Sequence, residues 1–461
     1  MTSKSTLPIL IPAALAGVVA FTALAAPKTP DAAAAAKPEP KTVLFNNVRV
    51  LDSAKGNLSG VMNVLVKGNT ILRITEEGIP TDRSGLTLVI NGEGRTLMPG
   101  LIDNHTHMFM TASSQMDMLK PGATPETITA AALVEAERML LRGFTAVRDL
   151  GGPSFEMKKA IDARTAKGPR IYPSGAMISQ TSGHGDTRLP NEKSRRFFGQ
   201  PSKGELMGVN FIADGVDEVL TATRENLRYG ATQIKVMAGG GAATAYDPLD
   251  VAQYTFAELK AAVDAADDWN TYVTVHAYTP KAVRRAVEAG VKCIEHGQLL
   301  DEPTLQLLAE KGVWLSLQIL DEAPTAAPEH IRAKKHQVVE GTNNAFQWAK
   351  KHKVKLAWGT DMMFDPGQMK NQNPNIVRLK QWFTPGEALK IVTHDNAELL
   401  ALSGPRNAYP GKLGVVEEGA LADLLLVDGD PTADLELVAD PDKNFRVIMK
   451  DGKIFKNTVS K

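Results

Sequence analysis

The chain has 461 residues, 43% hydrophobic and 23% charged, and its 52 lysines and arginines equal its 52 aspartates and glutamates. This composition is typical of a globular protein with one large core and a smaller unit. The balanced charge offers no basic field and no acidic tail, so no nucleic-acid partner is expected. The single cysteine, Cys293, excludes an intrachain disulfide and a cysteine-rich zinc site.

Residues 1–25 are predicted to be a signal peptide. Lys4 precedes an apolar run over residues 7–24, and Ala23-Leu24-Ala25 fits the small-residue cleavage pattern. An uncleaved membrane anchor is the alternative on the same pattern. Residues 26–41 follow as an Ala/Pro/Lys linker. We therefore expect an exported protein, periplasmic or secreted, with no membrane contact once the signal peptide is removed.

Both ends of the remaining chain are predicted to be rich in β-strands. Segments 43–51 and 64–72 have strand composition and lie between turn signals. The pattern returns at 423–428, 445–449 and 453–455, where Asp451-Gly452 is typical of a two-residue hairpin turn. We predict one small composite β-sandwich domain, built from residues 42–96 and 406–461.

Residues 97–405 alternate strands with helices, which indicates an α/β fold with parallel strands. Eight such units predict a (β/α)8 TIM barrel, which places its chemistry at the C-terminal ends of its strands. The longest insert, residues 180–215, follows the third strand and is expected to cover the pocket. The predicted helices cover 125–142, 255–269, 280–289, 302–311 and 330–351. The predicted strands end near His107, Asp149, Gly175, Ala238, Tyr278, Gly297, Ile319 and Asp361.

Potential metal ligands gather at the ends of these strands. His105 and His107 are two residues apart on the first strand, so their imidazoles point to the same side. Taken alone, the pair could equally be satisfied by ordinary hydrogen bonds. The fifth, sixth and eighth strands add His276, His296 and Asp361 at corresponding positions. Such clustering of imidazole and carboxylate groups predicts a metal site.

Lys235 lies inside the apolar fourth strand, where a charged amine is costly unless it is paired or neutralised. Carbamylation by carbon dioxide would convert it into an anionic oxygen ligand able to bridge two metals. The alternative is an interior lysine paired with Asp149 or Glu295.

This constellation resembles the amidohydrolase superfamily over essentially all of the chain after the signal peptide. The matching features are the His-Thr-His of the first strand, the fourth-strand lysine, the two later histidines and the eighth-strand aspartate. Segments 234–241, 294–297 and 182–186 are similar to the imidazolonepropionase-related branch. That branch includes Xaa-Pro-type dipeptidases, enzymes that cleave dipeptides before Arg or Lys, and ochratoxin-type amidases.

The resemblance implies a binuclear zinc site with carboxylated Lys235 and a hydroxide bridging the metals. One metal would be held by His105, His107 and Asp361, and the other by His276 and His296. Such a centre can activate water and polarise a carbonyl group. Asp361 would take the proton and pass it to the leaving amine. Manganese or cobalt would also suit these ligands.

The expected reaction is hydrolysis of the amide bond in a dipeptide or an N-acyl amino acid by a homo-oligomeric enzyme. A cyclic-amide or imidazolone hydrolase, a lactonase or an organophosphate hydrolase on the same metal site are alternatives. A catalytically silent metal-binding protein is disfavoured because Asp361 is present, since a silent relative would most cheaply lose it.

Several residues have two interpretations. His184, in the glycine-rich loop after the third strand, contacts substrate or polarises the scissile carbonyl, or else stabilises its loop. Tyr246 donates a hydrogen bond to substrate or packs within its loop, and Asp149 orients a ligand histidine or forms an ordinary salt bridge. Cys293 is expected in the core. His394 is expected to be structural, and the histidines of the long last helix solvated (330, 336 and 352). The candidates for a substrate carboxylate are Arg188, Arg195 and Arg196.

Overall fold

The computed structural model describes residues 41–81, 86–244 and 246–459. The predicted signal peptide (1–25) and all but the last residue of the predicted linker (26–41) lie outside these residues. Among the helices of the described part, none is both long and apolar enough to cross a bilayer.

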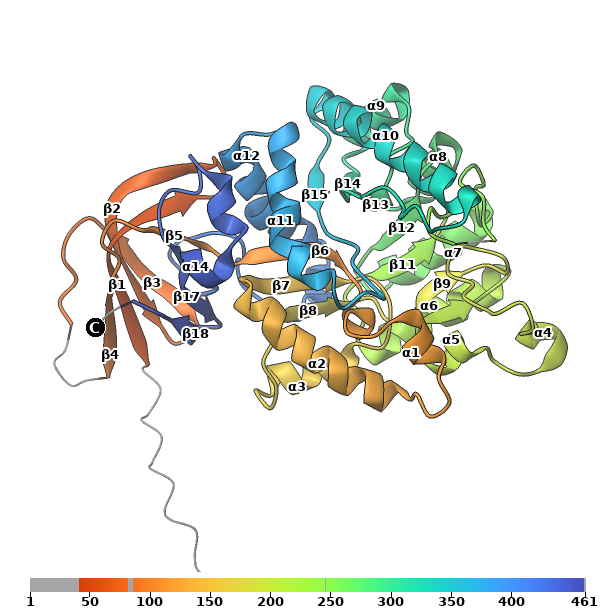
Figure 1. The fold of residues 1–461 in the computed structure, drawn as a ribbon, viewed down its shortest axis with the longest axis horizontal. Coiled ribbons are helices and arrows are strands. Elements are labelled where there is room, and N and C mark those ends of the chain that lie inside the picture. Colours follow the sequence, from red (N-terminus) through yellow and green to blue (C-terminus); the bar gives the residue numbers. More distant parts are fainter. Residues whose placement is uncertain (1–40, 82–85, 245, 460–461) are drawn as a thin grey trace, which may run out of the picture. The chain divides into compact units, whose positions relative to one another are not determined.

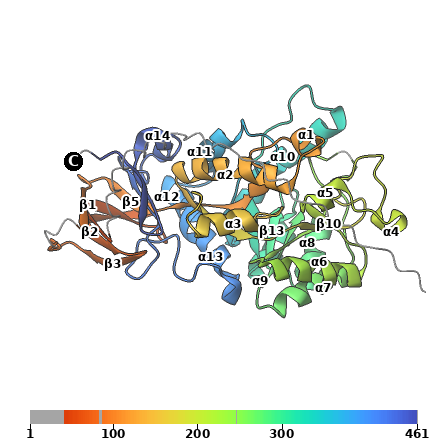
Figure 2. The same ribbon diagram turned by 90° about the horizontal axis from the view of Figure 1, so that it is seen from below.

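The two ends of the described chain meet in one eight-stranded sheet. The strands are in the order β18-β17-β16-β5-β1-β2-β3, and β4 also pairs with β1. Antiparallel pairing of β16 with β5, with Leu425 opposite Met98, joins the C-terminal strands to the N-terminal ones. Figures 1 and 2 show the C-terminal part of the chain, in dark blue, beside the N-terminal strands β1 and β5. The sheet consists of β1 (Thr42–Asp52), β2 (Asn57–Lys67), β3 (Thr70–Thr75), β4 (Thr87–Asn91), β5 (Thr96–Pro99), β16 (Leu424–Val427), β17 (Phe445–Lys450) and β18 (Lys453–Asn457).

The structure thus brings together the two segments that the sequence pairs. That they form a separate β-sandwich with boundaries at 42–96 and 406–461 stays a prediction. This sheet has a buried apolar cluster of its own, in which Phe45, Leu97 and Val447 are fully shielded from solvent.

Between these ends, the structure contains every one of the predicted parallel strands. They are β6 (Leu101–Thr106), β7 (Phe144–Asp149), β8 (Arg170–Pro173), β11 (Ile234–Met237), β12 (Val273–Ala277), β13 (Cys293–His296), β14 (Trp314–Leu317) and β15 (Leu356–Trp358). Two short strands in and before the predicted insert, β9 (Met177–Ser179) and β10 (Asn210–Ile212), were not predicted.

The parallel strands form two sheets rather than one uninterrupted ladder. The orders are β6-β7-β8 and β10-β9-β11-β12-β13-β14-β15. Side-chain amides replace ladder hydrogen bonds at both interruptions. Asn396 donates to Ile102 O at 2.7 Å and Trp358 O at 2.9 Å, while Gln233 Nε2 donates to Tyr172 O at 2.8 Å. The fold is therefore α/β with parallel strands, and its sheet is not closed by a continuous ladder as the predicted barrel requires.

The helices begin and end largely where the sequence places them. Thr255 and Glu258 form a capping box at the start of α7, and α8 ends at Gly290 in the left-handed region (φ 103°). The longer helices are α2 (Pro125–Leu141), α3 (Phe155–Asp162), α6 (Val216–Tyr229), α7 (Phe256–Asp267), α8 (Pro280–Ala289), α9 (Glu302–Lys311) and α10 (Glu329–His352). The shorter ones are α1 (Gln115–Leu119), α4 (Arg195–Phe198), α5 (Lys203–Leu206), α11 (Gln372–Val377), α12 (Pro385–Lys390), α13 (Asn396–Ala401) and α14 (Pro441–Asn444).

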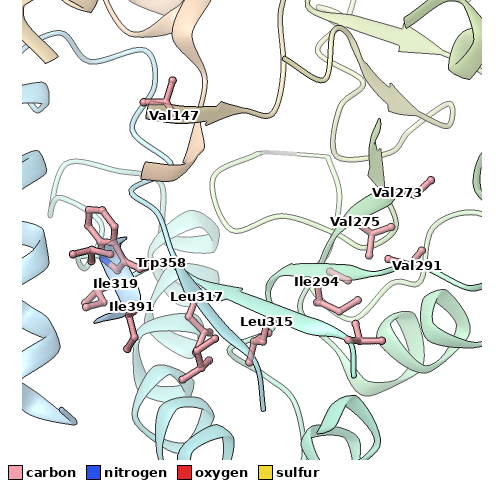
Figure 3. Close-up of a cluster of buried hydrophobic side chains, with 14 of the residues drawn as sticks. Val147, Val273, Val275, Val291, Ile294, Leu315, Leu317, Ile319, Trp358 and Ile391 are labelled. Atoms are coloured by element: carbon pink, nitrogen blue, oxygen red, sulfur yellow. The ribbon is translucent and has the colours of Figure 1, made fainter. Parts of the chain in front are cut away.

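The main core lies where the parallel strands face their helices. Val147, Val275, Ile294, Leu315 and Trp358 come from five different strands and are fully buried (Figure 3). These strands are buried along their whole length, although polar residues interrupt the apolar ones, as in β6 and β13. The polar residues at the ends of these two strands are therefore buried as well.

Candidate metal centre

Two histidines and one carboxylate converge at the ends of β6 and β15. Asp361 Oδ1 lies 3.2 Å from His105 Nε2 and 3.1 Å from His107 Nε2. One ligand atom from each residue lies within 4.8 Å of the other two. His105 and His107 are almost fully buried, whereas the Asp361 side chain keeps 17% exposure. This set can hold a divalent cation.

The backbone is strained at Asp361 and at His296, the histidine that ends β13. Asp361 has φ 54° and His296 has φ 75°, a left-handed conformation that costs about 1–2 kcal/mol for a residue with a Cβ atom. The Asp361 amide donates to His105 O at 2.7 Å, which joins the end of β15 to β6. A Cβ atom at Gly359 would lie 2.4 Å from His105 N, so only glycine permits this approach.

Three more imidazoles lie beside this set. The His296 ring is 5.1 Å from the His105 ring and 4.3 Å from the His276 ring, centroid to centroid. His184 stacks on His276 at 4.0 Å with an interplanar angle of 17°. The structure therefore brings the histidines of β12 and β13, and that of the loop after β9, to the place where the sequence predicts the site.

Lys235 is buried in the middle of the group. Its Nζ atom lies 3.5 Å from His105 Nε2, and only 1% of the residue is exposed. Among the described residues it forms no ion pair with a carboxylate. Asp149 and Glu295, its predicted alternative partners, both contact other groups. Burial lowers the pKa of the Lys235 amine.

Glu295 lies behind the metal ligands, where sequence reasoning gave it no role beyond a partner for the lysine. Its Oε2 is 2.9 Å from His105 Nδ1, and its Oε1 accepts from Arg148 Nη2 at 2.6 Å. Arg148 and Glu295 are both fully buried. A carboxylate on Nδ1 fixes the tautomer of His105 so that Nε2 faces the site. The sequence signal that could have identified Glu295 is its position directly before the ligand histidine His296 in a buried strand.

The electrostatics favour neutral imidazoles at three of the four strand histidines and an ionised carboxylate, whereas Asp361 and Glu295 outweigh burial and raise the pKa of His105. Burial lowers the pKa of His107 to about 4 and those of His276 and His296 well below the usual value. Burial alone would raise the pKa of Asp361, but the charge of His105 and hydrogen bonds with His105 and His107 outweigh it and hold that pKa well below its usual range. Neutral His107, His276 and His296 and ionised Asp361 are in the protonation states that metal binding requires.

Two ring nitrogens of the site histidines are buried without a hydrogen-bond partner in the described part of the chain. Among the described residues, His107 Nδ1 and His296 Nδ1 are buried and form no hydrogen bond. A buried polar atom left without a partner is costly and needs a reason. The nitrogen of His107 that faces the site is Nε2, so the observation that shows a donor set fitting a cation is the convergence of His105, His107 and Asp361.

Two further side chains border the site. Asp247 Oδ2 is 2.9 Å from His184 Nδ1, so the loop histidine has a buried carboxylate partner that the sequence did not reveal. Tyr278 stacks on His296 at 5.1 Å and lies perpendicular to His276 at 5.1 Å. Its position two residues after the β12 histidine, and so on the same side of the strand, was the signal that was missed.

Several sequence predictions are corrected by the contacts. Among the described residues, Asp149 pairs with neither a ligand histidine nor a charged side chain: it accepts from Met108 N at 2.7 Å and Ser154 Oγ at 2.5 Å and so holds the turn after β6. Tyr246 is 64% exposed, so it is not packed within its loop. Cys293 is buried in the core, as predicted.

The three arginines proposed for a substrate carboxylate are bound to other residues in and beside the insert. Arg188 binds both oxygens of Asp186, at 2.7 and 2.5 Å, and Arg196 pairs with Glu218 at 2.8 Å. Arg195 donates to Ile212 O at 3.1 Å. The remaining histidines form local contacts: His336 with Glu322 and Glu340, His352 with Glu302, and His394 with Asp395, while His330 is exposed.

Comparison with known proteins agrees with this fold. A family model described as the amidohydrolase family matches residues 96–455, so the chain belongs to the amidohydrolase family. It is 34% identical to an ochratoxinase of Aspergillus niger over 371 residues, which cover 78% of this chain and 75% of that protein.

Two solved structures are also similar. A prolidase complexed with N-methylphosphonate-L-proline has a TM-score of 0.81 and 32% identity, covering 90% of this chain and all of that one. A Xaa-Pro dipeptidase with bound methionine has a TM-score of 0.76 and 27% identity, with the same coverage. The chain is therefore a hydrolase whose relatives act in general on amides.

Proposed function

We propose that this protein is a binuclear metal-dependent amidohydrolase that cleaves the amide bond of dipeptides or N-acyl amino acids and releases the C-terminal amino acid. The observation that carries the proposal is the convergence of His105, His107, Asp361, His276 and His296 around buried Lys235. The names of the relatives, an ochratoxinase, a prolidase and a Xaa-Pro dipeptidase, support amide substrates of this class.

In this proposal His105, His107 and Asp361 would hold one zinc ion, and His276 and His296 would hold the other. Lys235 would supply a further anionic oxygen ligand as a carbamate, formed when its neutral amine adds to carbon dioxide and loses a proton. The burial of Lys235 without a carboxylate partner among the described residues supports this role, because an unpaired ammonium group there would be costly. We further propose that the parallel strands function as one (β/α)8 barrel, with the site at its C-terminal face.

The metal ions, when bound, would lower the pKa of water and polarise a carbonyl oxygen. The side chains would supply the proton transfer and the substrate contacts. Asp361 accepts no hydrogen bond at Oδ2 from the described residues, so Oδ2 can take a proton and deliver it to the leaving amine. His184, whose Nδ1 faces Asp247, can accept a hydrogen bond from the substrate at Nε2, and the Tyr278 ring borders the same space.

The test measures metal content per chain in wild type and Lys235→Ala, together with ¹³C NMR of protein supplied with ¹³C-bicarbonate. We expect two metals and a lysine carbamate signal in wild type, and fewer metals and no signal in the variant. Release of free amino acids from a dipeptide and N-acyl amino acid panel should occur only with wild type. Lys203→Ala is the matched control. One metal or none in wild type, with Lys235→Ala unchanged, would contradict the proposal.

Export through the signal peptide at 1–25 and assembly into a homo-oligomer remain predictions from the sequence. N-terminal sequencing of the protein secreted by its host, and light scattering of the purified protein, would test them.

A further inference from the structure

The loop between β11 and α7 contains a polar cluster that the proposed mechanism does not yet use. The loop is closed at its base by an antiparallel bridge between Gly239 and Ala252. Asp247 lies within it and is only 2% exposed. A buried carboxylate is uncommon unless its oxygens are bound, so its partners indicate its purpose.

Both oxygens of Asp247 are occupied. Oδ2 lies 2.9 Å from His184 Nδ1, and Oδ1 accepts a hydrogen bond from the Thr244 hydroxyl. Lys334, on α10, donates to the backbone oxygens of Thr244 and, at 3.1 Å, of Asp247. The lysine therefore ties the turn that carries the carboxylate to a long helix.

The position of His184 is restricted on its other sides as well. Its ring stacks on His276, its backbone amide donates to Gln253 Oε1 at 2.9 Å, and a Cβ atom at Gly241 would lie 1.9 Å from ring atoms. A carboxylate can only accept, so the proton on Nδ1 belongs to the imidazole. Nε2 is then the atom left to face the substrate, and no described residue forms a hydrogen bond with it.

We infer that Asp247 is a positioning residue that acts through His184: it fixes the Nδ1–H tautomer and the ring orientation, so that Nε2 faces the substrate as a hydrogen-bond acceptor. The inference rests on the proposed function, because it assigns the substrate contact to His184. Thr244 and Lys334 hold the carboxylate in place. A carboxylate orients a catalytic imidazole in the same way in serine hydrolases.

A double-mutant cycle tests the inference by kinetics. Asp247→Ala should lower kcat about 10- to 100-fold, with KM changed much less, because the contact strengthens in the transition state. Asp247→Asn keeps an acceptor oxygen and should recover part of the loss. In a His184→Ala background, Asp247→Ala should have no further effect. Asp250→Ala, at an exposed aspartate of the same loop, is the matched control and should behave as wild type.

A second measurement does not need turnover. Nitrogen-15 shifts of labelled histidine, assigned with His184→Ala, report which ring nitrogen carries the proton. We expect a proton on Nδ1 of His184 in wild type, and a changed tautomer distribution in Asp247→Asn, which should fold because it is isosteric.

The outcomes separate the two ideas. A wild type that hydrolyses nothing in the panel, but has Nδ1–H on His184, contradicts the proposed function and leaves the positioning role intact. A bare Nδ1 with the proton on Nε2 overturns the positioning role. So does an equal loss from Asp247→Ala with and without His184, since the carboxylate would then only shape its loop.

Discussion

The two halves of the candidate site are held in different ways. His105, His107, Lys235, His276 and His296 stand on or directly after buried strands, so the backbone of the parallel sheets positions them.

His184 stands on a loop and depends on Asp247, Thr244 and Lys334 for its place. We therefore expect substitutions in the strand-held half to affect metal binding and folding. Substitutions in the loop-held half should affect turnover alone.

The largest effect is expected from Asp361→Asn. The amide cannot take up a proton as the carboxylate does, so kcat should fall about 10³- to 10⁴-fold. Rates and metal content are measured on the same preparation, and Asp365→Asn, at an exposed aspartate nearby, is the control. Equal turnover in Asp361→Asn and wild type would contradict the proposed reaction.

Glu295→Gln sharpens the comparison on the strand-held side. It leaves Arg148 buried without its charge partner, so unfolding in urea should show a loss of about 3 kcal/mol. Zinc affinity should fall about 10- to 100-fold because His105 loses its orienting group. The control is Glu436→Gln, which breaks an exposed pair with Lys380. Unchanged zinc affinity would show that Glu295 is purely structural.

Gly241→Ala tests the loop-held side. The added methyl group would collide with the His184 ring, which Asp247 and His276 prevent from moving freely. We expect kcat/KM to fall about tenfold with full metal content. Gly78→Ala, where nothing lies within 4 Å of the new Cβ, should match wild type. Loss of metal from Gly241→Ala would break the distinction between the two halves.

The smallest effect is expected from Arg196→Ala. Its partner is Glu218 and 60% of its side chain is exposed, so stability should change by less than about 1 kcal/mol. KM should also stay as in wild type, because the arginine is already paired with Glu218 of α6. A large rise in KM for carboxylate-bearing substrates would restore the earlier expectation that Arg196 binds the substrate carboxylate.

Local patterns explain what sequence reasoning could reach. Strand and helix periodicity located the parallel strands, and Thr255 and Gly290 cap their helices as such residues do. The residue spacing also placed His105 and His107 on one side of a strand. The interrupted sheet was beyond reach, because the side chains of Asn396 and Gln233 replace backbone pairing only after distant segments meet.

By itself, then, the sequence determined the order of the elements, the family and the ligand candidates at the strand ends, because these depend on short-range periodicity and on residue type. Tertiary structure alone decided the partners: Glu295 with Arg148, 147 positions apart, and His184 with Asp247, 63 positions apart. It also showed that Arg188 and Arg196 are paired with other residues. Such choices depend on which distant side chains are desolvated together, and no local pattern encodes that.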